Sequence, residues 1–250
     1  PVMMHDFVVT EHYAIFLDAP AVFDLRQMLD GHDPMSWQPD NGTRLGVIPR
    51  GGSGTDVRWF EIDNCYVVHF FNAWENGNTI EIRAPRMPDM PGGFQFENPG
   101  AAREPMPWRW TIDLTTGKVT DEQISDLASE FPRVDDLRAA HRTRYGYACP
   151  QRSWDFAFDF EGVVKYDFET GATSAHSYRD SEVSGEHVFA ADPDGTAEDD
   201  GWLLSFVSDR ETETTDLVIL DARDVTADPV ARVKMAARVP IGFHANWFAD

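Results

Sequence analysis

Short runs of apolar and β-branched residues, separated by turn-forming residues, dominate this chain. Runs of this length bounded by Gly, Pro, Asn and Asp are typical of β-strands and their turns. We expect strands at residues 7–18, 44–48, 57–62, 65–72, 79–84, 108–114, 153–160, 163–168, 187–191, 202–208, 216–220 and 232–239. Two stretches predict helices: residues 21–29, with apolar residues at helical spacing, and residues 121–128, which begin with acidic residues. The pattern predicts an all-β chain.

A weak internal repeat sharpens the fold prediction. Asp113, Asp167 and Asp221 lie 54 residues apart, and each follows an apolar strand; the first two are followed by Gly117 and Gly171. An Asp side chain can bond the backbone of its own turn, and Gly supplies the positive φ that such turns require. A strand–turn–strand unit of about 50 residues indicates propeller blades, four to five in a chain of 250 residues. The alternative is three unrelated β-hairpins with coincident spacing.

The charge of the chain limits its partners. The net charge is −22, and three of the 21 basic residues are lysines. Nucleic acid and anionic membranes need positive charge on the protein, so the composition argues against both as principal partners. Cys65 and Cys149 form neither a disulfide framework nor a metal knuckle, which favours a reducing cytoplasm. No apolar run approaches the length of about 18–20 residues that spans a bilayer.

Both ends of the sequence predict a fragment. The chain opens on PVMMHDFVV and enters an apparent strand at once, and it stops shortly after the histidine of GFHANWFAD. No composition shift marks a boundary between domains. We therefore expect residues 1–250 to form a single-domain partial propeller that lacks its N-terminal blades.

Three of the eight histidines share an apolar setting. His5, His69 and His244 each have aromatic or aliphatic neighbours on both sides, whereas His12, His32, His141 and His176 lie among polar or turn residues and predict surface positions. A buried imidazole needs partners for both ring nitrogens, and a metal ion is one such partner. A core histidine bonded to a backbone carbonyl is the simpler reading of any one of them. As a metal site, an all-imidazole set suits Fe(II), Zn or Cu.

Five stretches resemble the carotenoid cleavage oxygenase family and occur in its order. They are MMHDFVVTEHYAIF, WFEIDNCYVVHFFNAWENGN, EFPRVD, GEHVFAADPDGTAEDDGWLLS and VPIGFHANWF. The resemblance implies a seven-bladed β-propeller, of which this chain covers roughly the C-terminal half, with a non-heme Fe(II) held by four histidines. It implies that His5, His69 and His244 are the second, third and fourth ligands.

The resemblance also implies glutamates behind the ligands. Glu130 of EFP would support His69, and Glu186 of GEHVF would support His244, because a carboxylate fixes the orientation and tautomer of a ligand imidazole. Read alone, both glutamates are ordinary solvated residues. The family's first histidine and the glutamate that supports His5 would lie before Pro1. The family usually has Pro where this chain has His187, which we expect to point away from the metal.

The implied activity is Fe(II)-dependent, O2-dependent cleavage of a C=C bond in a carotenoid, apocarotenoid or stilbene-like substrate, giving two carbonyl products. Expected partners are a small apolar alkene and O2, with at most weak peripheral membrane contact. Three alternatives stay open: an inactive propeller fragment, a binding or scaffold module with structural histidines, and a three-histidine zinc hydrolase. Aromatic residues that could line a substrate tunnel, but that more simply form core, are Phe70, Phe71, Trp74, Phe94, Phe96, Phe243 and Trp247.

Overall fold

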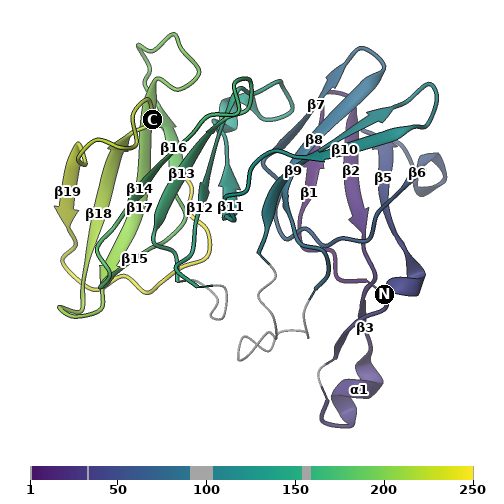
Figure 1. Cartoon of the computed structure of the whole chain (residues 1–250), viewed down its shortest axis with the longest axis horizontal. Coiled ribbons are helices and arrows are strands. Elements are labelled where there is room, and N and C mark those ends of the chain that lie inside the picture. Colours follow the sequence, from purple (N-terminus) through teal and green to yellow (C-terminus); the bar gives the residue numbers. More distant parts are fainter. Residues whose placement is uncertain (1, 33, 91–103, 154–158, 250) are drawn as a thin grey trace. The chain divides into compact units, whose positions relative to one another are not determined.

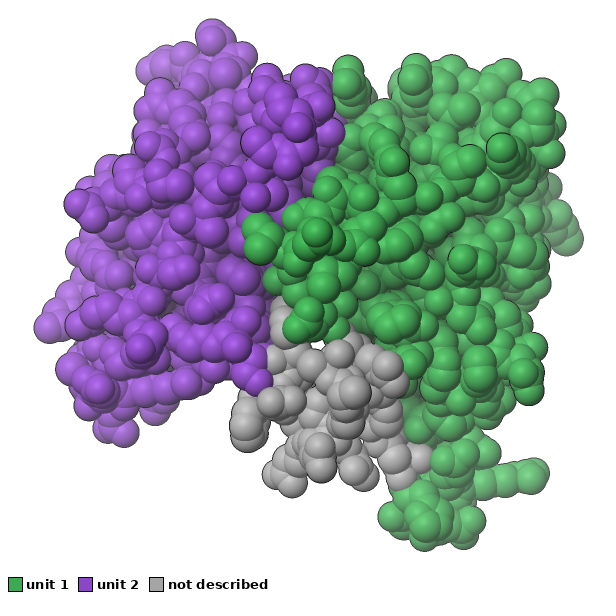
Figure 2. Space-filling view, viewed as in Figure 1, with its two compact units in different colours: residues 1–128, 139–142, 154–157 green, residues 129–138, 143–153, 158–250 purple. Residues whose placement is uncertain are grey.

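Antiparallel β-sheets make up nearly all of the regular structure (Figure 1). The computed structural model describes residues 2–32, 34–90, 104–153 and 159–249. The chain divides into two compact units, coloured separately in Figure 2. Unit 1 comprises residues 1–128, 139–142 and 154–157, and unit 2 comprises residues 129–138, 143–153 and 158–250. The predicted all-β class is confirmed.

Unit 1 contains two four-stranded antiparallel sheets. The first has the order β1-β2-β5-β6 and the second β10-β9-β8-β7. Their strands are β1 (Phe7–Val9), β2 (Tyr13–Asp18), β5 (Thr43–Pro49), β6 (Arg58–Ile62), β7 (Asn72–Asn76), β8 (Thr79–Arg86), β9 (Met106–Asp113) and β10 (Val119–Gln123). One hydrophobic cluster joins both sheets, because residues such as Ile15 and Leu45 of the first pack with Ile80, Ile82 and Ile112 of the second.

A small hairpin is inserted between β2 and β5. It consists of β3 (Ala21–Phe23), helix α1 (Leu25–Leu29) and β4 (Met35–Trp37). Asp24 begins the helix as its N-cap, since its side chain accepts a hydrogen bond from the Arg26 amide. The predicted helix at 21–29 is therefore correct only for its second half. Short 3-10 turns occur at Pro39–Asn41, Gly54–Asp56 and Asp136–Arg138.

Unit 2 contains the other two sheets, with the orders β11-β12-β13-β14 and β15-β17-β18-β19, the latter with β16 also paired to β17. Their strands are β11 (Glu130–Arg133), β12 (Tyr145–Cys149), β13 (Gly162–Asp167), β14 (Thr173–Ser177), β15 (Glu182–Ser184), β16 (Val188–Ala191), β17 (Gly201–Asp209), β18 (Thr214–Asp221) and β19 (Ala231–Lys234). Tyr147 and Val163 of one sheet pack with Leu203 and Val218 of the other.

The aspartate repeat marks the same position in three sheets. Asp113, Asp167 and Asp221 are the last residues of β9, β13 and β18, each of which leads to an edge strand of its sheet, namely β10, β14 and β19. The Oδ1 atom of each accepts hydrogen bonds from backbone amides two or three residues later. Gly117 and Gly171 have φ of 76° and 74°. The repeat is a repeat of sheets, as predicted.

Two predicted elements are wrong. Residues 121–128 are not helical, because Val119–Gln123 forms β10, paired residue by residue with Trp108–Ile112 of β9. Residues 65–71 are not a strand: they are mostly buried, but their ladder is limited to the bridge between Tyr66 and Met87. Pairing with β9 overrides a weak helix propensity in the first case. In residues 65–71, the apolar run reflects burial of a segment that is not part of a sheet.

Smaller differences concern boundaries. The predicted strand 7–18 is two strands joined by a turn, and the predicted strand 232–239 ends at Lys234. Most of the predicted strand 153–160 lies outside the described residues. Within the described residues, no helix is both long and apolar enough to cross a membrane. Whether the two units constitute one domain stays a prediction.

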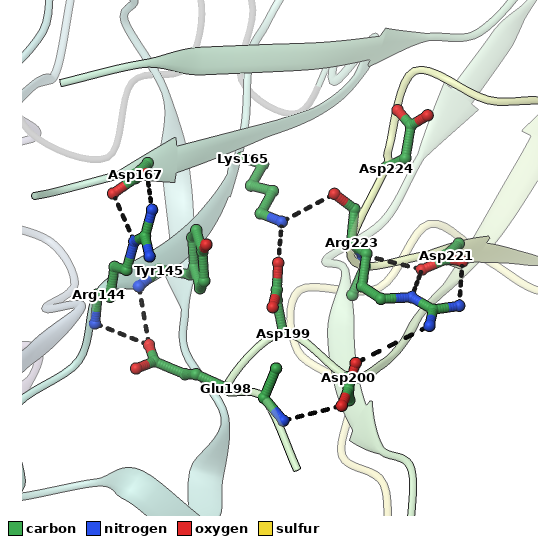
Figure 3. A network of polar contacts seen from close by, with 12 residues as sticks. Arg144, Tyr145, Lys165, Asp167, Glu198, Asp199, Asp200, Asp221, Arg223 and Asp224 are labelled. Atoms are coloured by element: carbon green, nitrogen blue, oxygen red, sulfur yellow. Dashed lines mark hydrogen bonds and ion pairs between the residues drawn. The ribbon is translucent and has the colours of Figure 1, made fainter. Parts of the chain in front are cut away.

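A row of three acidic residues attaches the loop after β16 to unit 2 (Figure 3). Glu198 accepts hydrogen bonds from the backbone amides of Arg144 and Tyr145, both at 2.8 Å. Asp199 lies 2.6 Å from the ammonium of Lys165. Asp200 caps the turn by accepting from two backbone amides of its own loop. The loop between β16 and β17 of one sheet is thereby held to β12 and β13 of the other.

Candidate metal centre

Two of the predicted metal ligands lie side by side in unit 1. His5 precedes β1 and His69 precedes β7, and their ring centroids are 5.0 Å apart in an edge-on arrangement with an interplanar angle of 78°. Residues separated by 64 positions thus meet through tertiary structure. Two imidazoles at this distance can direct nitrogens at a shared ion.

Asp6 holds the two histidine segments together. Its Oδ2 accepts a hydrogen bond from the Phe70 amide at 3.0 Å, and its Oδ1 accepts from the Phe7 amide at 2.8 Å. The residue after one histidine therefore binds the residue after the other. Sequence reasoning missed this role, although an Asp directly beside a candidate ligand in MHDF was a usable signal.

The exposure of the histidines differs from the prediction. His5 and His244 are exposed and His69 is half-buried, although all three were expected to be core-like. The reason is local: none of the three lies in a strand, so none has its side chain on the face of a sheet that packs against another layer. Apolar neighbours in sequence did not translate into burial.

The residues after His69 fasten neighbouring segments. The Asn72 side chain donates to the carbonyl of His141 at 2.7 Å and accepts from the amide of Ala140 at 3.0 Å. Glu75 accepts from the Thr10 hydroxyl at 2.5 Å and from the His12 amide at 2.8 Å. The expectation that Asn72–Glu75 shapes the site without a catalytic role stays a prediction.

In unit 2, Glu186 receives the C-terminal segment that carries His244. Its Oε2 accepts a hydrogen bond from the Ala245 amide at 2.8 Å, and its Oε1 lies 3.4 Å from Nδ1 of His244. The carboxylate is buried, with 3% of its side chain exposed. Because Nδ1 faces the carboxylate, a metal bound by this ring would be bound through Nε2 on its other side.

Glu130 begins β11 just before an irregularity. The register of β11 against β12 shifts between Glu130 and Arg133, and Phe131 has a φ of 53°, a left-handed conformation that is rare for a bulky residue. The Phe131 ring packs edge-on against His244, with centroids 5.1 Å apart, and in a tilted arrangement against Phe160, with centroids 4.8 Å apart. Glu130 is buried, and its Oε2 accepts from the Phe131 amide at 2.6 Å. Its pairing with His69 stays a prediction.

His187 points away from Glu186, as expected for successive residues of an extended chain. Its ring is buried in unit 2, with Nδ1 3.4 Å from the Cys149 sulfur and Nε2 3.0 Å from the Tyr178 hydroxyl. Burial and the neighbouring His176 lower the pKa of His187 to about 3. Burial raises the pKa of the Cys149 thiol and of the Tyr178 phenol, so all three groups are neutral.

The aromatic tunnel candidates fall into three groups. Phe70, Phe71 and Trp74 are buried, in agreement with the simpler core reading. Phe243 and Trp247 are exposed and line two surface cavities beside Glu186 and Val188, respectively. Phe94 and Phe96 lie outside the described residues.

The donor set fits a metal held by neutral nitrogen ligands. His5, His69 and His244 are the candidate ligands, and this group includes neither of the two buried cysteines. Burial also raises the pKa of Cys65 to about 11, so it stays a thiol at neutral pH. A site with imidazole ligands and no thiolate suits iron, copper or zinc.

Comparison with known proteins decides the family. The sequence model described as "RPE65: Retinal pigment epithelial membrane protein" matches residues 1–249. A carotenoid cleavage oxygenase of Mycobacterium tuberculosis is 32% identical over 98% of this chain and 58% of its own length. The chain belongs to the RPE65/carotenoid cleavage oxygenase family.

Other members of the family are similar to the chain in sequence and structure. An isoeugenol monooxygenase of Pseudomonas putida is 34% identical over 98% of this chain and 54% of its own length. A solved mutant of the Synechocystis apocarotenoid oxygenase superposes with a TM-score of 0.89 at 28% identity, covering all of this chain and 53% of that one. The chain spans about half the length of the relatives it matches.

Proposed function

We propose that this chain is the C-terminal half of a seven-bladed propeller enzyme, a non-heme Fe(II) dioxygenase that cleaves a C=C bond with O2 to give two carbonyl products. The observation that carries the proposal is the pair of imidazoles at 5.0 Å, His5 and His69, in a chain that matches the oxygenase family from residue 1 to residue 249. His244 of unit 2 would be a further ligand of the same ion.

The side chains behind the histidines support this assignment. Glu186 would orient His244 through Nδ1 and leave Nε2 for the metal, and Glu130 would do the same for His69. Asp6 keeps the segments of His5 and His69 together. When bound, Fe(II) would supply the redox chemistry with O2, which no protein side chain can supply. Buried Phe70 and Phe71 would exclude water from the ligand side.

The names of the relatives suggest the substrate class. Relatives are described as acting on carotenoids, apocarotenoids and isoeugenol, and a cobalt-substituted form of the Synechocystis enzyme has been solved. We infer a small apolar alkene as substrate and the cytoplasm as the location, with no nucleic-acid partner. An inactive fragment or a scaffold with structural histidines is the alternative.

The test is metal content followed by turnover. We expect the purified protein to retain Fe(II), and His69→Ala to lose it, since one ligand of the close pair is removed. Apocarotenoid, stilbene and isoeugenol substrates would then be offered with O2, and aldehyde products measured. A protein that takes up zinc but no iron, and that hydrolyses an ester without consuming O2, would refute the proposal in favour of a hydrolase. If the purified protein is folded but contains no iron, and His69→Ala leaves its stability unchanged, a scaffold is favoured.

A further inference from the structure

A guanidinium stands behind the carboxylate that contacts His244. Nη1 of Arg133 lies 3.6 Å from Oε1 of Glu186, the same oxygen that lies 3.4 Å from Nδ1 of His244. Arg133 is the last residue of β11, and all three residues belong to unit 2. The arrangement is therefore a row of Arg133, Glu186 and His244 within one compact unit.

The other end of the same guanidinium is fixed. Nη2 of Arg133 donates to Oδ2 of Asp136 at 2.8 Å, and Asp136 is largely in water. A planar guanidinium that contacts two carboxylates has a defined orientation, which a single flexible ion pair would not give it. Arg133 is itself mostly buried, with 17% of its side chain exposed. It therefore links the protein surface to the buried Glu186.

A nearby cation such as Arg133 both stabilises the negative charge of the buried Glu186 carboxylate and orients it. A buried carboxylate without a cation or hydrogen-bond donors is strongly disfavoured. The Ala245 amide holds Oε2, and it leaves Oε1 free to rotate out of line with the imidazole. Arg133 acts on Oε1. We propose that Arg133 is a positioning residue for the metal site, which fixes the Glu186 carboxylate and through it the ring of His244.

The irregularity of β11 explains how Arg133 reaches this position. Residues 130 and 133 of a regular strand would point to opposite faces, and the register shift between Glu130 and Arg133 re-aims the side chains of this strand. The short segment EFPR would then supply both the glutamate assigned to His69 and the arginine behind Glu186. This inference rests on the proposed function.

The test uses Co²⁺ as the probe, because bound Co²⁺ has a visible spectrum that reports ligand geometry. The purified protein would be loaded with Co²⁺, and its spectrum and its rate of metal loss to a chelator measured. We expect Arg133→Met to lose Co²⁺ roughly 10-fold faster, the lower end of the range for residues behind a ligand, with shifted absorption bands. Arg133→Lys should recover part of the loss, because it keeps the charge without the second contact.

Arg152→Met is the matched control. Arg152 is another mostly buried arginine of unit 2, with a carboxylate partner in Asp159 at 3.2 Å, and the described contacts of Glu186 do not include it. We expect its Co²⁺ spectrum and release rate to equal those of the wild type. A second measurement places Arg133→Met on a Glu186→Gln background, where it should have no further effect if Arg133 acts through Glu186.

The outcomes separate this inference from the proposed function. Equal spectra and release rates for wild type and Arg133→Met would overturn the role of Arg133 while leaving the metal site intact. Equal effects of Arg133→Met and Arg152→Met, or a full effect on the Glu186→Gln background, would overturn it as well. A wild-type protein that binds neither Co²⁺ nor Fe(II) would overturn the proposed function and this inference together.

Discussion

A single carboxylate, Asp6, joins two chain segments that lie 64 positions apart. It accepts one backbone amide on each of its two oxygens, from Phe7 and Phe70. Asp6 itself adjoins His5 and the Phe70 amide adjoins His69, and the rings of these two histidines lie 5.0 Å apart. One short side chain therefore links the segment of His5 to the segment of His69.

Substitution of Asp6 should weaken metal retention in proportion to the acceptors lost. Asp6→Asn keeps one oxygen and should have a small effect, whereas Asp6→Ala removes both and should weaken retention roughly 10-fold. Metal content after dialysis against a chelator is the measurement. Asp18→Ala, which breaks an ion pair with Arg44 in the same sheet, is the control. Equal retention by Asp6→Ala and wild type would show that the histidines are held otherwise.

His187 illustrates how burial sets the charge of one residue. Its pKa is lowered to about 3 by burial and by His176, and its two nitrogens are occupied by Cys149 and Tyr178. An unfolded histidine takes up a proton near pH 6.5. Between these two values the unfolded chain binds more protons than the folded one, so stability falls as the pH falls.

We expect this effect in urea unfolding measured from about pH 7 to pH 5. Below pH 6.5, His187 alone should shift the unfolding equilibrium toward the unfolded chain by about tenfold per pH unit. His187→Gln, which cannot take up the proton, should flatten the dependence in this window while leaving the acid limb below pH 4.5, where carboxylates such as Glu182 titrate. An unchanged slope in His187→Gln would mean that the ring is accessible to protons.

At the scale of elements, β11 combines function and strain. Phe131 adopts a φ of 53°, which costs a non-glycine residue about 1–2 kcal/mol. Its ring packs against Phe160 and His244, so packing holds the strained backbone in place. Strain of this kind is typical of positions where the surrounding structure determines a conformation that the residue itself disfavours.

At Phe131 the Gly variant should therefore be more stable than the Ala variant, the reverse of the usual order in a strand. Phe131→Ala and Phe131→Gly both lose the ring, but only Gly tolerates the positive φ, so Phe131→Gly should be the more stable by about 1 kcal/mol. At the buried Phe189 of β16, which is not among the positive-φ residues, the Ala variant should be the more stable. Urea unfolding of the four variants measures both differences. The same order at the two sites would contradict the strain argument.

The loop after β16 depends on the pair of Lys165 and Asp199. The Lys165 side chain is 8% exposed, and its ammonium lies 2.6 Å from Asp199 and 3.0 Å from the Arg223 carbonyl. The Tyr145 ring lies 4.3 Å from the same ammonium. A buried ammonium whose carboxylate is removed loses the partner that offsets its desolvation.

Asp199→Ala should destabilise the protein by about 1–3 kcal/mol, less than for a fully buried pair because Asp199 keeps some contact with water. Asp194→Ala, an exposed aspartate of the same loop, should change stability by no more than about 0.5 kcal/mol. The midpoint and slope of urea unfolding report both. Similar small effects of the two variants would show that the loop is held by its backbone contacts alone.

At the scale of the whole molecule, the charge is the dominant property. A net charge of −22 on 250 residues produces repulsion that disfavours the compact state. The described ion pairs offset it only in part, because most of them have an exposed partner and contribute little. Added salt screens the long-range repulsion over about 8 Å at physiological ionic strength.

Thermal unfolding should therefore shift upward with salt. Raising NaCl from about 0.02 to about 0.5 M should increase the unfolding midpoint by several degrees, since repulsion is screened more than the short ion pairs are weakened. KCl should act equally, because the effect depends on ionic strength. A midpoint that falls with salt would show that the ion pairs, and not the net charge, dominate the electrostatics.

The sequence by itself determined the class of fold and the family. Alternation of short strands and turns, and the aspartates at 113, 167 and 221, are local signals, because a strand alternates within itself and a turn aspartate bonds its own backbone. The motifs around His5, His69 and His244 identified the family for the same reason, since they are contiguous in sequence.

Only the tertiary structure decided how the side chains meet. The contact of Asp6 with residue 70 and the row of Arg133, Glu186 and His244 each join segments that sequence spacing does not relate. The apolar sequence around residues 65–71 wrongly predicted a strand, and the apolar neighbours of the three histidines wrongly predicted burial. Neighbours in sequence do not show which residues cover a side chain in the folded protein. Distance in space is set by packing of the whole sheet, and no local pattern encodes it.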